Sequence, residues 1–263
     1  MMELDANTWP LALVQAFLGQ AVGYFAVVGL VFLVVWKWGA RRLAGARIQG
    51  KRLFNARQWR HEVTHTLITL FLGTLTVGVL SLLHANGATR LTADAAEAGG
   101  PWMVLTFVGL IIFNDPWFYW WHRLLHHPRI YKYVHGVHHH SVDVNPFSSY
   151  SFHALEGFIL GAWIRPMALV LPMYLPMLGV LQVVGLANNV ISHLGYELLP
   201  RWFIRVPPFG WLSSATYHSL HHTRLTGNYG LVFRFWDRLM KTEVADYEER
   251  FVLRGAQAAA EAG

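Results

Sequence analysis

Long apolar segments separated by short polar ones dominate the chain, and three of them have the length of a membrane span. The first covers about residues 11–36, the second about 63–83, and the third starts near Pro101 and continues to His122. About 20 apolar residues in a helix are enough to cross the hydrocarbon core of a bilayer. We therefore predict three transmembrane helices, and we expect the third to leave the membrane as one continuous helix that carries His122.

A fourth apolar region, residues 158–186, is interrupted by Pro166, Pro172 and Pro176. Proline removes a helix hydrogen bond and so breaks or kinks a helix. The pattern fits either a fourth span with a short return or two shallow half-spans in a hairpin. Residues 198–212, which follow, mix Trp, Phe and Leu with arginine and are typical of an amphipathic segment at the membrane interface.

The composition also favours a membrane protein. Of the 263 residues, 54% are hydrophobic and 14% are charged, whereas about a quarter of the residues in a soluble domain are charged. The chain has no cysteine. Disulfides, thiolate zinc sites and thiol catalysis are therefore excluded.

The basic residues are concentrated in one loop. Residues 37–60 contain eight Lys or Arg and no acid, whereas residues 84–100 contain one Arg against Asp94 and Glu97. Because Lys and Arg are enriched in cytoplasmic loops, we expect residues 37–60 in the cytoplasm and residues 84–100 on the other side. This asymmetry accounts for the net charge of +6, and we expect no nucleic-acid partner.

Three histidine clusters carry the candidate chemistry: HRLLH at 122–126, HGVHH at 135–139 and HSLHH at 218–222. Residues three and four apart on a helix share a face, so we expect each cluster to direct its imidazoles to one place. Neutral imidazole is the commonest protein ligand of transition metals. Because the clusters hold more ligands than one ion needs, we predict a site for two metals, held almost entirely by histidine.

A polar stripe connects the third span with the first cluster. Asp115, Tyr119, His122 and His126 are spaced four, three and four residues apart and so share a helix face. An acid near the membrane is costly without a function. We predict that Asp115 supports the site by accepting the free ring N–H of a metal-binding histidine, with Tyr119 as a further supporting residue. The alternative is that Asp115 pairs only with an interfacial Arg or Trp.

The sequence around these clusters resembles the fatty acid hydroxylase/sterol desaturase superfamily of membrane-bound non-haem di-iron enzymes. The clusters occur in the expected order, with DPWFYWWHR before the first, FHALEG after the second and HHTRLTGNYGLVFRFWDRL around the third. The resemblance covers about residues 105–242. It implies an all-α fold, a multi-pass membrane helical bundle with a cytosolic, histidine-rich cap that holds two metals.

We accordingly divide the chain into an N-terminal transmembrane region (1–104), a catalytic domain (105–245) and a C-terminal tail (246–263). His153 stands in FHALE, in which the proline of the family's FHPxE-like element is missing. His127 and His140 are expected to flank the site, although a first cluster with longer spacing could use His127. The metal ligands that the resemblance implies are His122, His126, His135, His138, His139, His153, His193, His218, His221 and His222.

The resemblance implies an O2-dependent oxidoreductase that hydroxylates or desaturates an unactivated C–H position of a sterol, fatty acyl chain or related lipid. The cofactor would be two iron ions (Fe2+/Fe3+), with O2 as co-substrate. An electron donor such as cytochrome b5, or ferredoxin with its reductase, would supply two electrons. The protein would lie in a bacterial inner membrane or the endoplasmic reticulum, with its active site facing the cytoplasm.

Two other functions are open from the sequence. The segment His61-Glu62-His65 is a literal HExxH, in which two histidines on one helix face bind zinc and the glutamate is the general base. An intramembrane zinc metalloprotease would leave the three clusters unexplained, and Glu62 is otherwise expected to be an interfacial residue. A histidine-rich metal transporter would hold its ions near the bilayer midplane, whereas these clusters lie at the ends of spans.

Overall fold

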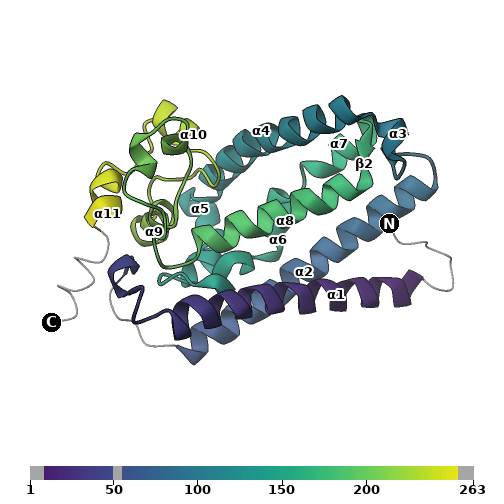
Figure 1. The fold of residues 1–263 in the computed structure, drawn as a ribbon. Coiled ribbons are helices and arrows are strands. Elements are labelled where there is room, and N and C mark those ends of the chain that lie inside the picture. Colours follow the sequence, from purple (N-terminus) through teal and green to yellow (C-terminus); the bar gives the residue numbers. More distant parts are fainter. Residues whose placement is uncertain (1–8, 50–54, 254–263) are drawn as a thin grey trace.

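A computed structural model describes residues 9–49 and 55–253. Within them, four helices are long and apolar enough to cross a membrane. They are α1 (Trp9–Val31, continued by the π-helical segment η1, Phe32–Trp38), α2 (Ala56–Ala85), α4 (Gly100–Leu125) and α8 (Leu175–Ser192). In Figure 1, α1, α4 and α8 run along the long direction of the molecule, and α2 runs obliquely to α1.

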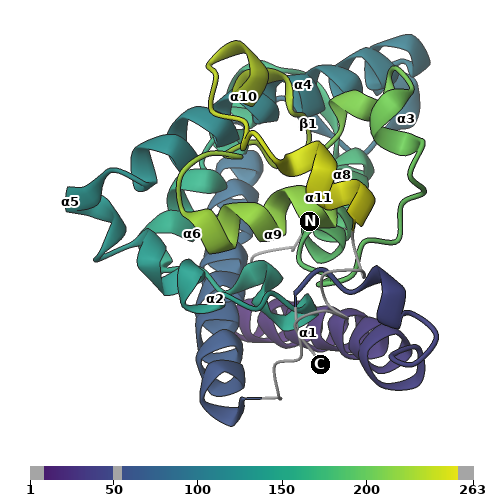
Figure 2. The same cartoon turned by 90° about the vertical axis from the view of Figure 1, so that its left-hand side faces the viewer.

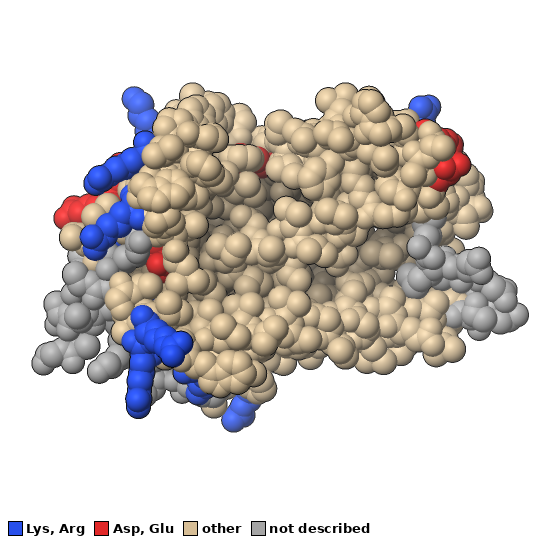
Figure 3. All heavy atoms as spheres, viewed as in Figure 1, with Lys and Arg blue, Asp and Glu red and all other residues tan. Residues whose placement is uncertain are grey.

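The outer faces of these helices are apolar. Leu11, Leu18 and Val22 on α1 and Val104 and Leu105 on α4 are each more than half exposed. A helix that is apolar all round belongs in a protein core or a membrane. Figure 3 shows Lys, Arg, Asp and Glu gathered at the two ends of the molecule and nearly absent between them. The prediction of an all-α fold built on apolar, membrane-capable helices is confirmed.

The interrupted apolar region crosses the molecule twice. It leaves the histidine-rich end as α6 (Ala154–Leu160) and α7 (Ile164–Val170) and reaches strand β2 (Met173–Tyr174). β2 pairs in parallel with β1 (Leu91–Thr92), beside the short helix α3 (Ala95–Ala98), so the chain is then at the end where residues 84–100 lie. α8 returns from there to His193. This path through the molecule agrees with a crossing and a return rather than with two shallow half-spans.

A cap of short helices closes the histidine-rich end, which faces the viewer in Figure 2. Its elements are η2 (Ala44–Ala46), α5 (Pro128–Tyr131), η3 (His135–His140), η4 (Pro146–Tyr150), η5 (Phe203–Arg205), η6 (Phe209–Trp211), α9 (Ala215–Arg224), α10 (Phe235–Leu239) and α11 (Tyr247–Leu253). Because these helices are too short to be stable alone, they depend on packing against one another.

Part of the segment that the sequence assigns to the C-terminal tail belongs to this cap. Tyr247 and Phe251 of α11 are fully buried and pack with Tyr217 and Leu220 of α9. Residues 246–253 therefore support the helix that carries the third histidine cluster. The rest of the predicted tail, 254–263, lies outside the described residues.

Candidate metal centre

The first cluster sits where α4 ends. α4 runs unbroken from Gly100 to Leu125, as predicted, with His122 in its last turn and His126 as its C-cap. His127 precedes Pro128, and a residue before proline is driven into extended backbone; the ψ angle of His127 is 131°. Its side chain consequently turns away and accepts the N–H of Arg129. The alternative that used His127 in place of His126 is therefore not supported.

Nine of the described histidines form two groups, and within each group the potential ligand atoms lie within 4.8 Å of one another. All of these histidines are buried except His126, which is partly buried. The first group is His122, His126, His135, His139 and His221, and the second is His138, His193, His218 and His222.

Each HxxHH cluster divides its histidines between the two groups, so the expectation that a cluster points to one place is wrong. In α9, His218 and His222 are one helical turn apart and enter the second group, whereas His221 enters the first. His135 and His139 likewise belong to the first group and His138 to the second. Adjacent positions on a helix differ by about 100°, which lets one short segment place ligands on both sides of itself.

The ring orientation of most of these histidines is fixed by a hydrogen bond from Nδ1 to a backbone carbonyl. In the first group, His122 donates to Tyr229 O (2.7 Å) and His221 donates to Gly227 O (2.9 Å). In the second group, the acceptors are Ser141 O for His222 (3.0 Å), Ser151 O for His138 (3.2 Å) and Asn189 O for His193 (2.8 Å). Because Nδ1 carries the proton, Nε2 presents a lone pair.

The Nε2 atoms within each group lie close to one another. The Nε2 atoms of His122 and His135 are 2.9 Å apart, those of His139 and His221 3.1 Å, and those of His193 and His218 3.1 Å. Burial, reinforced by neighbouring histidines, lowers the pKa of His139 to about 3. Burial also lowers the pKa of His193 to about 4. The rings are therefore neutral near pH 7. In the pair His122 and His135, each Nδ1–H is held by an acceptor, so the two Nε2 lone pairs face each other and repel unless a cation lies between them.

The nitrogen spacing fits a shared metal ion. Two nitrogens bound to one ion at about 2.1 Å, at right to tetrahedral angles, lie about 3.0 to 3.4 Å apart. The closest Nε2–Nε2 separations in the two groups run from 2.9 to 3.3 Å. A donor set of neutral imidazoles suits zinc, copper, iron or nickel. Each group can therefore hold a transition-metal ion.

Glu156 is a site residue that the sequence reasoning missed. Its carboxylate is fully buried in α6 and accepts the Nδ1–H of His135 at 2.6 Å. A carboxylate in this position fixes the ring and makes the imidazole a stronger ligand. The FHALE element contains this residue, so the resemblance offered a signal for it.

His153, in the same element, lies outside both groups. It is the N-cap of α6, and its Nδ1 accepts the N–H of Leu155 at 3.2 Å. An N-cap side chain satisfies one of the free N–H groups at a helix start. The structure therefore gives His153 a local role and does not bring it to the other predicted ligands.

The predicted contact between Asp115 and a ligand histidine is wrong. Asp115 accepts the backbone N–H of Phe233 at 3.2 Å, while the ring of His122 donates to Tyr229 O instead. Asp115 therefore holds the chain segment after Tyr229 rather than the imidazole itself. Tyr119 is fully buried, and its hydroxyl pairs with Thr242 Oγ1 at 2.9 Å.

The HExxH segment lies inside α2, and neither of its histidines belongs to the two groups of potential metal ligands among the described residues. The rings of His61 and His65 are 4.4 Å apart, and His61 donates to Val137 O. Glu62 is only 1% exposed, so its prediction as an interfacial residue is wrong. Its carboxylate accepts hydrogen bonds from Ser141 and Asn145 as well as from Gln58. A glutamate held by these donors is not available as a general base.

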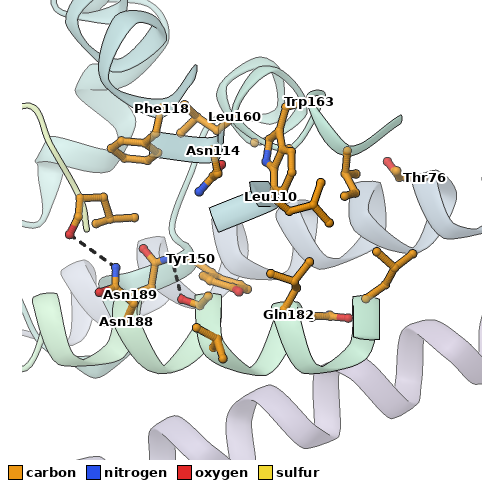
Figure 4. A pocket seen from close by; sticks show the side chains of 18 of the residues that line it. Thr76, Leu110, Asn114, Phe118, Tyr150, Leu160, Trp163, Gln182, Asn188 and Asn189 are labelled. Carbon is orange, nitrogen blue, oxygen red and sulfur yellow. Dashed lines mark hydrogen bonds between the residues drawn. The ribbon is translucent and has the colours of Figure 1, made fainter. Parts of the chain in front are cut away.

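A cavity of about 480 Å³ extends to two phenylalanines that pack on the metal groups. Phe118 and Phe152 line it, and their rings pack on His122 (5.0 Å) and His138 (4.7 Å), one histidine from each group. Figure 4 shows Asn114 near Phe118 at one end of the cavity, and Trp163 farther along it. The cavity therefore comes within one phenylalanine side chain of a histidine from each group. The elements that line it include α2, α4, α6 and α8.

The chain is similar to a known protein family and to several known proteins. The model of the fatty acid hydroxylase family matches residues 107–242. The chain is 28% identical over 191 residues to a Delta(7)-sterol 5(6)-desaturase of Gibberella zeae, covering 73% of this chain and 58% of the relative. It is 36% identical over 135 residues to methylsterol monooxygenase 1 of Gallus gallus, covering 51% of this chain and 45% of the relative. It is 30% identical over 193 residues to lathosterol oxidase of Homo sapiens, covering 71% of this chain and 61% of the relative. The chain thus spans about half the length of these relatives, and no solved structure matches it.

Removing one ligand from each group tests the division into two sites. We expect wild-type protein, purified in detergent from aerobically grown cells, to hold about two metal ions per chain. His122→Ala and His138→Ala should each retain about one, because each change breaks a different group. Metal per chain is measured by inductively coupled plasma mass spectrometry.

The matched control is His127→Ala, which removes the histidine next to His126 that faces away from both groups. It should keep the wild-type metal content. Full metal content in both ligand variants would contradict the assignment.

Proposed function

Since the chain belongs to the fatty acid hydroxylase family, we propose that it is a membrane-bound di-iron oxygenase that hydroxylates or desaturates an unactivated C–H position of a lipid. The observation that carries the proposal is the pair of groups of buried, neutral imidazoles at the end of an apolar cavity. In the proposed site, the residues of these two groups are the iron ligands.

A pair of irons bound there would supply the redox chemistry, in which O2 is reduced with two external electrons and a C–H bond is oxidised. The protein's part is ligation, orientation and the exclusion of water. The carbonyls of Tyr229 and Ser141, and the carboxylate of Glu156, fix the planes of three imidazoles. Burial keeps the ligands neutral and limits access of water to the site.

The cavity supports a lipid substrate. Leu110, Leu178, Leu181 and Trp163 are among the apolar side chains that line it, and a lipid chain gains free energy on entering such surroundings. Its volume is in the range of small-molecule sites. Because Phe118 and Phe152 pack on ligands of different groups, a chain that fills the cavity would present a carbon between the two groups. The relatives are a sterol desaturase, a methylsterol monooxygenase and a lathosterol oxidase, which favours a sterol or a related lipid.

We further propose that the chain crosses the membrane several times with the histidine-rich cap on the cytoplasmic side. Lys and Arg gather at the cap end of the molecule in Figure 3, which agrees with the positive-inside rule. A basic face of this kind favours an acidic electron carrier, such as cytochrome b5 or a ferredoxin with its reductase.

The proposed reaction is tested by lipid mass spectrometry on host cells with and without the protein. Hydroxylation adds the mass of one oxygen atom to a lipid, and desaturation removes that of two hydrogen atoms. We expect one such product with wild-type protein and none with His138→Ala, because the variant lacks a ligand. Unchanged lipid oxidation in cells carrying His138→Ala would overturn the proposed function.

Blocking the cavity should stop turnover without removing metal. Gly185 of α8 lines the cavity, and a Cβ added there would meet no atom within 4 Å. Gly185→Phe therefore has room for its Cβ and adds a ring at the lining of the cavity. We expect it to lower lipid oxidation by about tenfold to a hundredfold, with metal per chain unchanged.

The matched control is Gly179→Phe, on the same helix. Gly179 is exposed, has equally open space and does not line the cavity. It should keep wild-type turnover. Equal losses in both variants would show that the cavity is not the substrate site.

Single cysteines in the cysteine-free chain test the orientation. Ala88, at the end where residues 84–100 lie, and Tyr133, in the cap, are both exposed. We expect Tyr133→Cys to react with an impermeant thiol reagent only from the cytoplasmic side and Ala88→Cys only from the opposite side. Permeabilised membranes are the control in which both react. Labelling of both from the same side in sealed membranes would contradict the proposed topology.

A further inference from the structure

Two chain segments provide most of the carbonyls that orient the metal groups, and each serves a different group. Residues 227–229 provide Gly227 O and Tyr229 O, which accept from His221 and His122 of the first group. Residues 141–151 provide Ser141 O and Ser151 O to the second group. We call these segments the first and the second carbonyl loop.

Each loop is attached to a buried carboxylate from another part of the chain. Asp237 of α10 is fully buried and accepts the backbone N–H groups of Tyr229 (2.9 Å) and Gly230 (2.6 Å). Glu62 of α2 is 1% exposed and accepts from Ser141 Oγ (2.8 Å) and Asn145 Nδ2 (2.9 Å). Neither carboxylate hydrogen-bonds to any of the histidines that the structure describes in the two groups, so any effect on the metals must act through the loops.

The contact between Asp237 and the first loop is close. A Cβ at Gly230 would lie 3.1 Å from Asp237 Oδ2, and Gly227 has a φ of +98°, which side-chain-bearing residues rarely adopt. Each oxygen of Asp237 accepts a second hydrogen bond besides the one from the loop: Thr242 Oγ1 donates to Oδ1, and the Tyr217 hydroxyl donates to Oδ2. The position of Tyr229 O therefore depends on a carboxylate with two accepting oxygens.

Glu62 reaches two ligands of the second group through one loop. The residue that it holds, Ser141, gives its own carbonyl to His222. Asn145, which it also holds, is the N-cap of η4, and the residue at the other end of η4 is Ser151, whose carbonyl accepts from His138. Of the hydrogen bonds to Glu62, those from Ser141, Gln58 and Asn145 all reach Oε1, and Oε2 takes one further contact from Asn145.

We propose that Glu62 and Asp237 are positioning residues with separate tasks: Glu62 sets the metal affinity of the second group and Asp237 that of the first. The inference rests on the two-metal site of the proposed function, but not on the reaction catalysed there. It gives a role to Glu62 of the HExxH segment and to Asp237, which follows Trp236 in α10, neither of which is a metal ligand. Partners that orient ligating histidines typically change metal affinity by about 10- to 100-fold.

The test combines each carboxylate variant with a ligand variant that has already emptied one group. In the His122→Ala background only the second group keeps all its ligands, and in the His138→Ala background only the first. We expect Glu62→Ala to weaken iron binding by about 10- to 100-fold in the His122→Ala background and to leave it unchanged in the His138→Ala background. Affinity is measured by competition with a chelator. Asp237→Asn should show the reverse pattern, so the two variants are each other's controls.

The conservative substitutions should also differ. Glu62→Gln keeps an oxygen at the Oε1 position for three donors, so we expect most of the metal affinity to return. Asp237→Asn turns an NH2 group toward N–H or O–H donors and leaves a buried donor unpaired, so it should be nearly as damaging as Asp237→Ala. A role limited to general stability would weaken both groups equally and would show no such difference between the two conservative variants.

If Glu62→Ala does not fold, Ser141→Ala takes its place, because it removes the link to Glu62 while keeping the backbone carbonyl that His222 uses. An equal loss of metal in both backgrounds, or no loss in either, overturns the inference. These outcomes are distinct from failure of the proposed function: a wild-type chain that holds two irons and oxidises no lipid refutes the oxygenase, while the same chelator measurements still decide the roles of Glu62 and Asp237.

Discussion

The constraint on which the structure depends is the burial of many imidazole lone pairs in one small volume. The Nε2 atoms of His122 and His135 face each other at 2.9 Å, and both rings have their proton on the opposite nitrogen, toward Tyr229 O and Glu156. Without a cation this arrangement is repulsive, and without the surrounding hydrogen bonds the rings would rotate away from it. The cap can thus be understood as the set of acceptors that forces the rings into an orientation that only a metal stabilises.

The membrane-capable helices make that orientation possible by bringing distant segments to one end. α4 carries His122 in its last turn, α8 ends immediately before His193, and α2 brings Glu62 to the loop between the second cluster and η4. These helices are joined by apolar packing, such as the contact of Leu110 with Met173 and Met177 in one core cluster. The acceptors that orient the rings come instead from short loops, which can bend to present a carbonyl where a regular helix would use it internally.

The same arrangement connects the metal groups to a lipid-sized space. Phe118 follows Asp115 by less than one turn on α4 and packs against His122, while Phe152 follows Ser151, whose carbonyl holds His138. Phe152 is therefore next to a residue that orients a ligand, and Phe118 lies within one turn of Asp115, which holds Phe233 in the segment after Tyr229. A shift of either segment would alter both the metal site and the end of the cavity, which couples substrate position to metal geometry in the proposed oxygenase.

The sequence by itself determined the local features of this protein: the apolar spans, the continuous helix that carries His122, the histidine-rich cap and the resemblance to a family of di-iron enzymes. These depend on composition and on periodicity over a few residues. The division of each HxxHH cluster between two groups, the contact of Asp115 with Phe233 and the burial of Glu62 were decided only by the tertiary structure. Each of them depends on which distant backbone meets a given side chain: Tyr229 lies 107 residues from His122, and Ser141 lies 79 residues from Glu62. Spacing along one helix shows which way a side chain points, but the partner that it finds there depends on how the whole chain packs.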